Sequence, residues 1–142
     1  MLVKEICTLE EMLEQLPLVQ QLYPDMTKEK YEEMLRDMIP NNYSQVVVLD
    51  GEKCVGLSGI WFNTKLWTGK YLELDNVVTD KNHRSKGVGK LINNFAAEKA
   101  KQLGCKFIVL DAFTENRDAH RFYFRDGYVI RGFHFLKNIP SP

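Results

Sequence analysis

A basic turn with two glycines joins a strand-like segment to a helix-like one, and this turn constrains the chain most. Residues 71–79 read YLELDNVVT and predict a strand over about Lys70–Thr79. Apolar residues recur at helical spacing from Lys86 to Leu103, and Gly104 ends that segment. The turn between them, residues 83–91, reads HRSKGVGKL. Such a turn predicts a phosphate-binding loop, because glycines let backbone N–H groups converge where the helix dipole favours an anion. The alternative is a glycine-containing helix start with incidental basic side chains.

Single residues exclude two common phosphate loops. A Walker A loop requires GxxxxGK followed by Ser or Thr, but Arg84 stands at its first glycine and Leu91 follows Lys90. The dinucleotide fingerprint GxGxxG fails because Ile92 stands at its third glycine. The remaining pattern is Arg84-x-x-Gly87-x-Gly89.

This pattern resembles the R/Q-x-x-G-x-G/A motif of the GCN5-related N-acetyltransferase (GNAT) superfamily. A second segment, residues 116–123 (NRDAHRFY), resembles the family's N-x-x-A-x-x-F-Y motif and is followed by Gly127-Tyr128. One departure is Lys81, where many members carry proline. The resemblance covers nearly the whole chain, and the first helices are its least diagnostic part.

The element pattern predicts an α/β chain with one domain over residues 1–142 and the order β-α-α-β-β-β-α-β-α-β. The predicted segments are Val3–Cys7 (strand), Thr8 to about Pro17 (helix), Thr27 to about Met38 (helix), Ser44–Leu49, Lys53–Phe62 and Lys70–Thr79 (strands), Lys86–Leu103 (helix), Phe107–Ala112 (strand), Arg117–Arg125 (helix) and Tyr128–Leu136 (strand). The resemblance implies the GNAT fold, a mixed, mostly antiparallel twisted sheet of six to seven strands with about four helices.

The charges divide along the chain. The totals of 19 basic and 19 acidic residues argue against a nucleic-acid or anionic-membrane binder. Residues 1–80 hold 7 basic and 14 acidic side chains, a net charge of −7, whereas residues 81–142 hold 12 and 5, a net charge of +7. We therefore expect the second part to bind phosphates and the first to face a cationic molecule.

The cysteines and the lengths of the apolar runs indicate in which cellular compartment the protein is expected. Cys7, Cys54 and Cys105 form no CxxC pair and lie in apolar or β-like surroundings, which predicts buried free thiols and a reducing compartment. Cys105 is expected to pack rather than to act as a nucleophile. No run suits a signal peptide or a membrane span. We expect a cytoplasmic protein without a metal site, since the three histidines are scattered.

The resemblance implies acetyl-CoA as co-substrate. The implied contacts are Val77, Val78 and Thr79 along the pantetheine arm, Arg84, Ser85, Lys86, Gly87, Val88, Gly89 and Lys90 around the pyrophosphate, and Asn116, which would contact the pantetheine or cap the next helix. The N–H of Val78 would stabilise the oxyanion that develops on the thioester.

Acetyl transfer needs a neutral amine, and an alkylammonium with a pKa of about 10.4 must first lose a proton. Glu73 and Asp75 are two residues apart on a strand, so they share a face and are candidates for that base, directly or through a water. Ordinary exposed carboxylates or structural ion pairs are the alternative for both. Tyr123 matches the family's tyrosine that protonates the leaving CoA sulfur, with a plain core aromatic as its alternative.

Four other side chains are weaker candidates for a role in the active site. His120 lies one helical turn before Tyr123 and could relay protons, although a surface or capping role is expected. Trp61, Trp67 and Tyr71 either line the acceptor pocket or pack on the sheet.

Together these features predict an acetyl-CoA-dependent N-acetyltransferase, an acyltransferase that works by direct attack in a ternary complex. The segment from Asp118 to Phe135 looks like that of small aminoalkylphosphonate and aminoglycoside acetyltransferases, which favours a small, cationic primary amine as acceptor. A protein amine as acceptor and a non-catalytic acyl-CoA sensor are the alternatives. The resemblance leaves a homodimer open.

Overall fold

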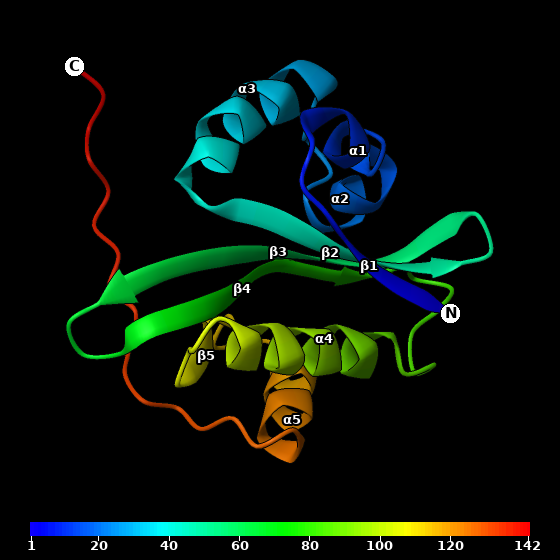
Figure 1. Ribbon diagram of the computed structural model, residues 1–142. Coiled ribbons are helices and arrows are strands. Elements are labelled where there is room, and N and C mark those ends of the chain that lie inside the picture. Colours follow the sequence, from blue (N-terminus) through cyan, green and yellow to red (C-terminus); the bar gives the residue numbers. More distant parts are fainter. The chain divides into compact units, whose positions relative to one another are not determined.

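A five-stranded sheet forms the centre of residues Met1–Leu110 (Figure 1). Its strands, in spatial order, are β1 (Leu2–Ile6), β2 (Tyr43–Asp50), β3 (Lys53–Lys65), β4 (Gly69–Thr79) and β5 (Phe107–Leu110). The first four pair antiparallel, and β5 pairs parallel to β4. The predicted mixed, mostly antiparallel sheet is confirmed, as is the hairpin turn at Asp50–Gly51, where Gly51 has a φ of 63°.

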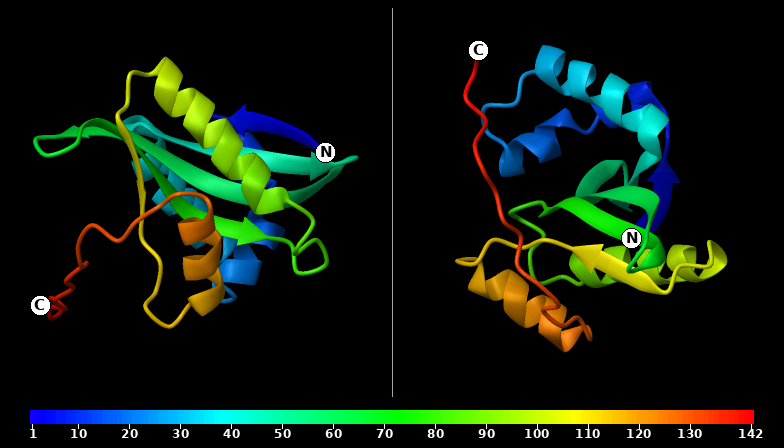
Figure 2. Two further views of the ribbon diagram at one scale, coloured as in Figure 1. Left: turned by 90° about the horizontal axis from the view of Figure 1, so that it is seen from below. Right: turned by 90° about the vertical axis from the view of Figure 1, so that its left-hand side faces the viewer.

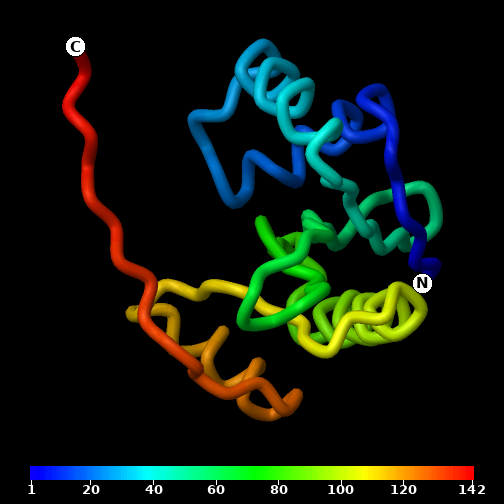
Figure 3. The backbone as a smooth tube through the Cα atoms, turned by 60° about the vertical axis from the view of Figure 1, so that its left-hand side comes forward, coloured from blue at the N-terminus to red at the C-terminus, as the bar shows by residue number.

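Helices cover both faces of this sheet (Figure 1 and Figure 3). One face carries α1 (Leu9–Leu13), α2 (Leu16–Leu22) and α3 (Lys28–Met38), followed by the 3-10 turn η1 (Ile39–Asn41), and the other carries α4 (Val88–Gln102). Figure 2 shows α4 lying across the strands. Each face has its own core, because side chains alternate along a strand. Val47 and Leu57 pack under α1–α3, whereas Val48 and Leu72 pack under α4.

The first predicted helix is two helices. Thr8 caps α1 in a capping box with Glu11, as its sequence position indicates. The chain then turns at Glu14 and Gln15, and Pro17 lies in the first turn of α2 rather than near a helix end. Proline is tolerated there because a first-turn N–H needs no partner.

The computed structural model describes residues 1–142, and Asp111–Pro142 form a second compact unit. This unit contains α5 (Arg117–Arg125), which begins at the predicted residue. The predicted strand Tyr128–Leu136 is wrong, because residues 128–142 form no regular secondary structure. The chain therefore has five strands rather than six to seven. A run of apolar and aromatic residues can suggest a strand, but only hydrogen bonds to a neighbouring strand make one.

Two further observations concern the burial of the cysteines and the apolar character of the helices. Cys7 is exposed, so the prediction of three buried thiols is wrong there, while Cys54 and Cys105 are half-buried. Cys7 follows the last residue of β1, where the chain leaves the sheet. None of the helices has the length and apolar character needed to cross a bilayer.

Candidate active site

A bulge divides β4 where its pairing to β3 shifts. Gly59 pairs with Asp75 and Leu57 pairs with Val78, so Ser58 alone lies opposite Asn76 and Val77. Asn76 has a φ of 55°, a left-handed conformation that asparagine tolerates better than most residues. Side chains alternate between the two sheet faces with a period of two residues. Because the bulge adds one residue to β4, each side chain after it points to the opposite face from the one that uninterrupted alternation would give.

Beyond the bulge, β4 has a backbone edge that no strand covers. Its pairing with β5 ends at Leu74, opposite Leu110. Residues 75–79 therefore pair with β3 on one side only. Such an edge offers N–H and C=O groups to an extended ligand. The predicted pantetheine-binding residues Val77, Val78 and Thr79 all lie on it.

This open edge leads into the N-terminus of α4. Gly87 is the N-cap with a φ of 83°, which glycine adopts without steric cost, and no side chain caps the helix. The first turn holds no acidic residue. Arg84, Lys86 and Lys90 are exposed, and Ser85 has a φ of 62°. An uncapped helix start flanked by cations is suited to binding a phosphate.

Gly56 of β3 allows α4 to pack closely against the sheet. A Cβ on Gly56 would overlap Cγ1 of Val88, the first residue of α4. Val88 is buried in the core of that face. The absence of a side chain at Gly56 therefore lets the helix start lie directly against β3.

The two predicted carboxylates lie on the sheet face that carries α1–α3. Glu73 pairs with Trp61 across the β3–β4 ladder, and Trp61 packs against the core of that face. Asp75, two residues further along, accepts a hydrogen bond at Oδ2 from Trp61 Nε1 at 3.0 Å. Both carboxylates are half-buried. Their predicted common face agrees with this register.

Trp61 belongs to a larger cluster of polar and aromatic side chains, which also contains Tyr43, Asn76 and Tyr23. The ring of Tyr43 lies 4.8 Å from that of Trp61, centroid to centroid. Its hydroxyl is 3.4 Å from Asn76 Oδ1, and Asn76 Nδ2 donates to the hydroxyl of Tyr23 at 2.8 Å. Burial raises the pKa of Tyr43, so its phenol stays protonated at neutral pH. Sequence reasoning missed Tyr23, Tyr43 and Asn76, because nothing in their local sequence marks them.

The other two aromatic candidates for the acceptor pocket make contacts of their own. Trp67 is exposed in the β3–β4 turn, 6.3 Å from the ring of Phe107. Tyr71 is buried, and Lys65 lies over its ring at 5.0 Å. Of the three predicted aromatics, Trp61 contacts a β4 carboxylate through a hydrogen bond.

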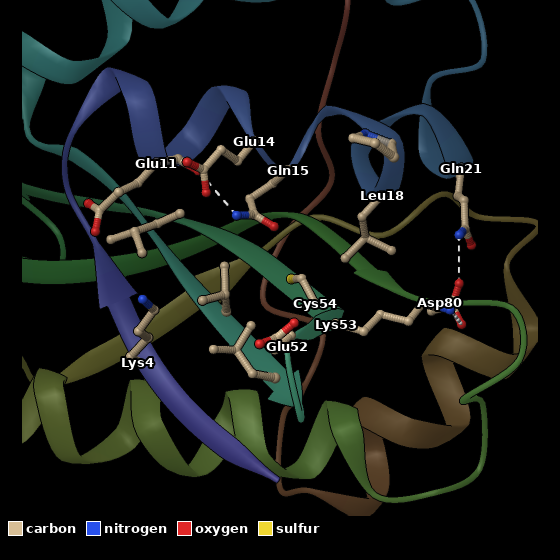
Figure 4. A pocket seen from close by; sticks show the side chains of 14 residues that line it. Lys4, Glu11, Glu14, Gln15, Leu18, Gln21, Glu52, Lys53, Cys54 and Asp80 are labelled. Carbon is tan, nitrogen blue, oxygen red and sulfur yellow. Dashed lines mark hydrogen bonds and ion pairs between the residues drawn. The ribbon is translucent and has the colours of Figure 1, made fainter.

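A cavity lies elsewhere on the same face. It has a volume of about 400 Å³ and lies between α1–α2 and strands β1–β3 (Figure 4). Its walls include Glu11, Glu14, Lys53, Cys54 and Asp80, but neither Glu73 nor Asp75. It is therefore distinct from the β4 carboxylate cluster.

The second unit contains the remaining predicted residues. Asn116 caps α5 by accepting a hydrogen bond from the Ala119 N–H at 3.2 Å. The ring of Tyr123 packs edge-on against those of Phe122 and Tyr128, and burial raises the pKa of its phenol. His120 Nε2 lies 2.9 Å from the carbonyl oxygen of Phe113, a local contact that fits a structural role.

The structure contains no cluster of three or more His, Cys, Asp or Glu side chains arranged to hold a metal ion. Desolvation raises the pKa of all three cysteine thiols, although it is only partial at the exposed Cys7, where Glu5 adds to it; all three stay protonated at neutral pH. The chemical groups gathered in residues Met1–Leu110 are thus an anion-binding helix start, an open strand edge and a pair of carboxylates.

Comparisons with known proteins identify the family of the chain. The model of the acetyltransferase (GNAT) family matches residues 9–128. An uncharacterized N-acetyltransferase of Bacillus subtilis, YhdJ, is 27% identical over 138 residues, which cover 96% of this chain and 97% of that protein. The aminoalkylphosphonate N-acetyltransferase of Salmonella typhimurium is 30% identical over 99 residues, 69% of this chain and 64% of that protein.

Among solved structures, the aminoglycoside N-acetyltransferase AAC(6')-Iy in complex with CoA has the same fold. It superimposes with a TM-score of 0.84 at 12% identity, covering 98% of this chain and 94% of that one. The family match spans most of the chain and includes both motif segments. The chain therefore belongs to the acetyltransferase (GNAT) family, and the protein is an acyltransferase.

Proposed function

We propose that this acetyltransferase transfers the acetyl group of acetyl-CoA directly to the primary amine of a small, cationic molecule. The observation that carries the proposal is the continuity of the open β4 edge, residues 75–79, with the uncapped start of α4. An extended arm ending in a diphosphate would match the two features in that order. We further expect a cytoplasmic enzyme.

Acetyl-CoA would be held largely by backbone groups. The edge residues Val77, Val78 and Thr79 would pair with the amide groups of the pantetheine arm, as an added strand does. The N–H groups from Arg84 to Lys90 would receive the pyrophosphate at the helix start. The exposed cations in this loop support that assignment, since they add attraction for phosphate. For Asn116, the observed capping bond supports a structural role over a contact with pantetheine.

The acceptor would lie on the α1–α3 side of β4. Asp75 or Glu73 would take a proton from the ammonium, directly or through a water, and so free the nitrogen lone pair for attack. The hydrogen bond from Trp61 favours Asp75, because it fixes one carboxylate oxygen and leaves the carboxylate group oriented. The N–H of Val78 would donate to the carbonyl oxygen as negative charge develops there.

As the C–N bond forms and the C–S bond breaks, the nitrogen must lose a second proton and the leaving sulfur must gain one. Tyr123 would donate the proton to the sulfur, and the proton released by the nitrogen would restore the phenol, directly or through a water. This assignment rests on the family motif, and the raised pKa supports it, because a buried phenol remains protonated. The three protonated thiols support direct attack over an acetyl-cysteine intermediate.

The acidic first part of the chain supports a cationic acceptor. Residues 1–80 have a net charge of −7. An aminoalkylphosphonate, the substrate class in the name of one relative, would instead need Arg or Lys beside the acceptor to receive its phosphonate. Asp75 is hydrogen-bonded to Trp61, and the neighbouring Asn76 contacts Tyr23 and Tyr43; none of these partners is a cation. We therefore rank polyamines and aminoglycosides above aminophosphonates.

The test is an assay of CoA-thiol release with a panel of amines: a polyamine, an aminoglycoside, an aminoalkylphosphonate and a lysine-containing peptide. Each is paired with the matching compound whose amine is replaced by a hydroxyl group. We expect turnover with the cationic small amines and none with the hydroxyl analogues. Preference for the peptide would favour a protein acceptor. Tight binding of acetyl-CoA without turnover of any amine would favour a sensor.

A further inference from the structure

Asp80, the first residue after β4, is a buried carboxylate between the strand and the glycine loop. Its side chain is 3% exposed, and its backbone N–H donates to the carbonyl oxygen of Val55 on β3 at 2.8 Å. A buried charge is costly unless it is paired and hydrogen-bonded. The sequence motif of the loop begins at Arg84, so Asp80 lies outside it.

Three side chains supply those partners from separate parts of the chain. Gln21 Nε2, on α2, donates to Asp80 Oδ1 at 2.7 Å. His83 Nδ1 lies 2.7 Å from Oδ2, and it must carry the proton, because the carboxylate only accepts. Lys53 Nζ, on β3, lies 3.3 Å from the same oxygen. These partners hold the pKa of Asp80 well below its ordinary value, with the Gln21 bond contributing most.

The same residues also fix the backbone of the loop. The N–H of His83 donates to the carbonyl oxygen of Asp80 at 2.8 Å, which closes a turn over residues 80–83. Gln21 uses the other end of its amide to accept the N–H of Lys81 at 3.0 Å. Figure 4 shows the Gln21–Asp80 bond at one end of the cavity. Helix α2 is thereby tied to both the side chain and the backbone of the loop's first residues.

His83 extends the connection to the β2–β3 turn. Its Nε2 lies 3.4 Å from Asp50 Oδ2, so the imidazole lies between two carboxylates from different elements. The next residue, Arg84, begins the segment that the proposed function assigns to the pyrophosphate. The path of that segment therefore starts from a residue that is hydrogen-bonded to Asp80 through Nδ1.

We propose that Asp80 is a positioning residue for acetyl-CoA: through Gln21, His83 and Lys53 it holds residues 81–87 in the path that presents the start of α4 to the pyrophosphate. This rests on the proposed function, since it presumes that the loop binds CoA. A loop ordered before binding loses less conformational entropy when the ligand binds. Loss of the anchor should therefore weaken CoA binding while leaving the chemical step intact.

The test compares three variants with the wild-type protein. Asp80→Asn keeps the size of the side chain, but its amide group presents donors toward Lys53 or His83 in place of an acceptor. Gln21→Ala removes the connection to α2 from an exposed position and does not disturb the core. Asp37→Asn, at an exposed site on α3, makes the same chemical change as Asp80→Asn without a partner in the loop.

Calorimetry with CoA gives the affinity, and thiol-release kinetics with saturating amine give kcat and the KM for acetyl-CoA. We expect Asp80→Asn to raise the Kd and this KM at least about tenfold and Gln21→Ala to raise them about threefold, with kcat within about threefold of wild type. Hydrogen exchange of residues 81–87 should become faster in both variants. Asp37→Asn should match the wild type in every readout.

The outcomes separate the two proposals. A wild-type protein that does not bind CoA contradicts the proposed function, whatever the variants do. A wild type that binds CoA, with both variants binding equally well, overturns the role of Asp80. A loss of kcat at unchanged CoA affinity overturns it too. Should Asp80→Asn unfold, Gln21→Ala decides alone, and unchanged CoA affinity in that variant refutes the inference.

Discussion

Trp61 donates the hydrogen bond from its indole Nε1 to Asp75 Oδ2 at 3.0 Å, and so joins the middle strand of the sheet to the carboxylate that lies just before the β4 bulge. The indole packs on Tyr43, which restricts its ring orientation. A carboxylate held in this way has one defined direction in which to receive a proton from an amine.

The first prediction concerns this carboxylate. Asp75→Asn should lower kcat/KM for the amine by about 10²–10⁴-fold, because general-base catalysis contributes that much, and leave the affinity for CoA unchanged. Glu73→Gln is the matched control, with the same change two residues away on the same face. A large loss in Glu73→Gln together with normal rates in Asp75→Asn would transfer the role to Glu73.

A second prediction concerns the proton for the leaving sulfur. Burial raises the pKa of Tyr123, so the phenol should stay protonated past its ordinary value of about 10. The profile of kcat against pH should therefore show no loss from Tyr123 ionisation below about pH 10. Tyr123→Phe should lower kcat by about 10²-fold at unchanged CoA affinity. A phenylalanine variant as fast as the wild type would contradict the assignment.

A third prediction concerns the close packing of α4 against Gly56 of β3. Gly56→Ala places a methyl group where Val88 Cγ1 lies, so the helix start must shift. We expect a loss of about 1–3 kcal/mol in the free energy of unfolding, together with weaker CoA binding. Gly132→Ala is the control, because a Cβ there meets nothing within 4 Å. Equal stability of the two variants in denaturant titrations would show that the contact at Gly56 is relieved without cost.

These contacts show where sequence reasoning succeeds and where it stops. The start of α4 beside Gly87 and the hairpin at Asp50–Gly51 are predicted well, because local turn chemistry determines both. The bulge at Asn76 is not foreseen, since the alternation of residues 71–79 does not reveal a shift in pairing with β3. The partners of Asp80 are also invisible, because Gln21 lies 59 residues away and meets it only in the fold.

The failed strand at Tyr128–Leu136 has a related cause. Its residues are largely apolar and aromatic, as in many strands, but a strand also needs the edge of another strand with which to pair. The division of the first predicted helix into α1 and α2 is different. Pro17 indicates that a helix terminus is near, but proline occurs in the first turn of a helix as well as just after its end.

A fourth prediction follows from the charge state of Asp80. Its pKa in the folded protein lies below the ordinary value of 3.8, so its contribution to stability is present above about pH 3.8 and is lost as the pH falls further. Asp80→Asn lacks this dependence. The difference in Tm between wild type and variant should shrink as the pH falls below about 4, because the Asp80 carboxylate then becomes protonated. A difference that grows as the pH falls below about 4 would contradict the sign.

Direct transfer within a ternary complex is tested most directly by initial rates of CoA-thiol release, with acetyl-CoA and the best cationic amine of the panel varied together. Double-reciprocal plots should give lines that intersect, because both substrates must be bound before the C–N bond forms. Parallel lines, together with an acetylated cysteine in the mass spectrum of the protein incubated with acetyl-CoA alone, would contradict the account.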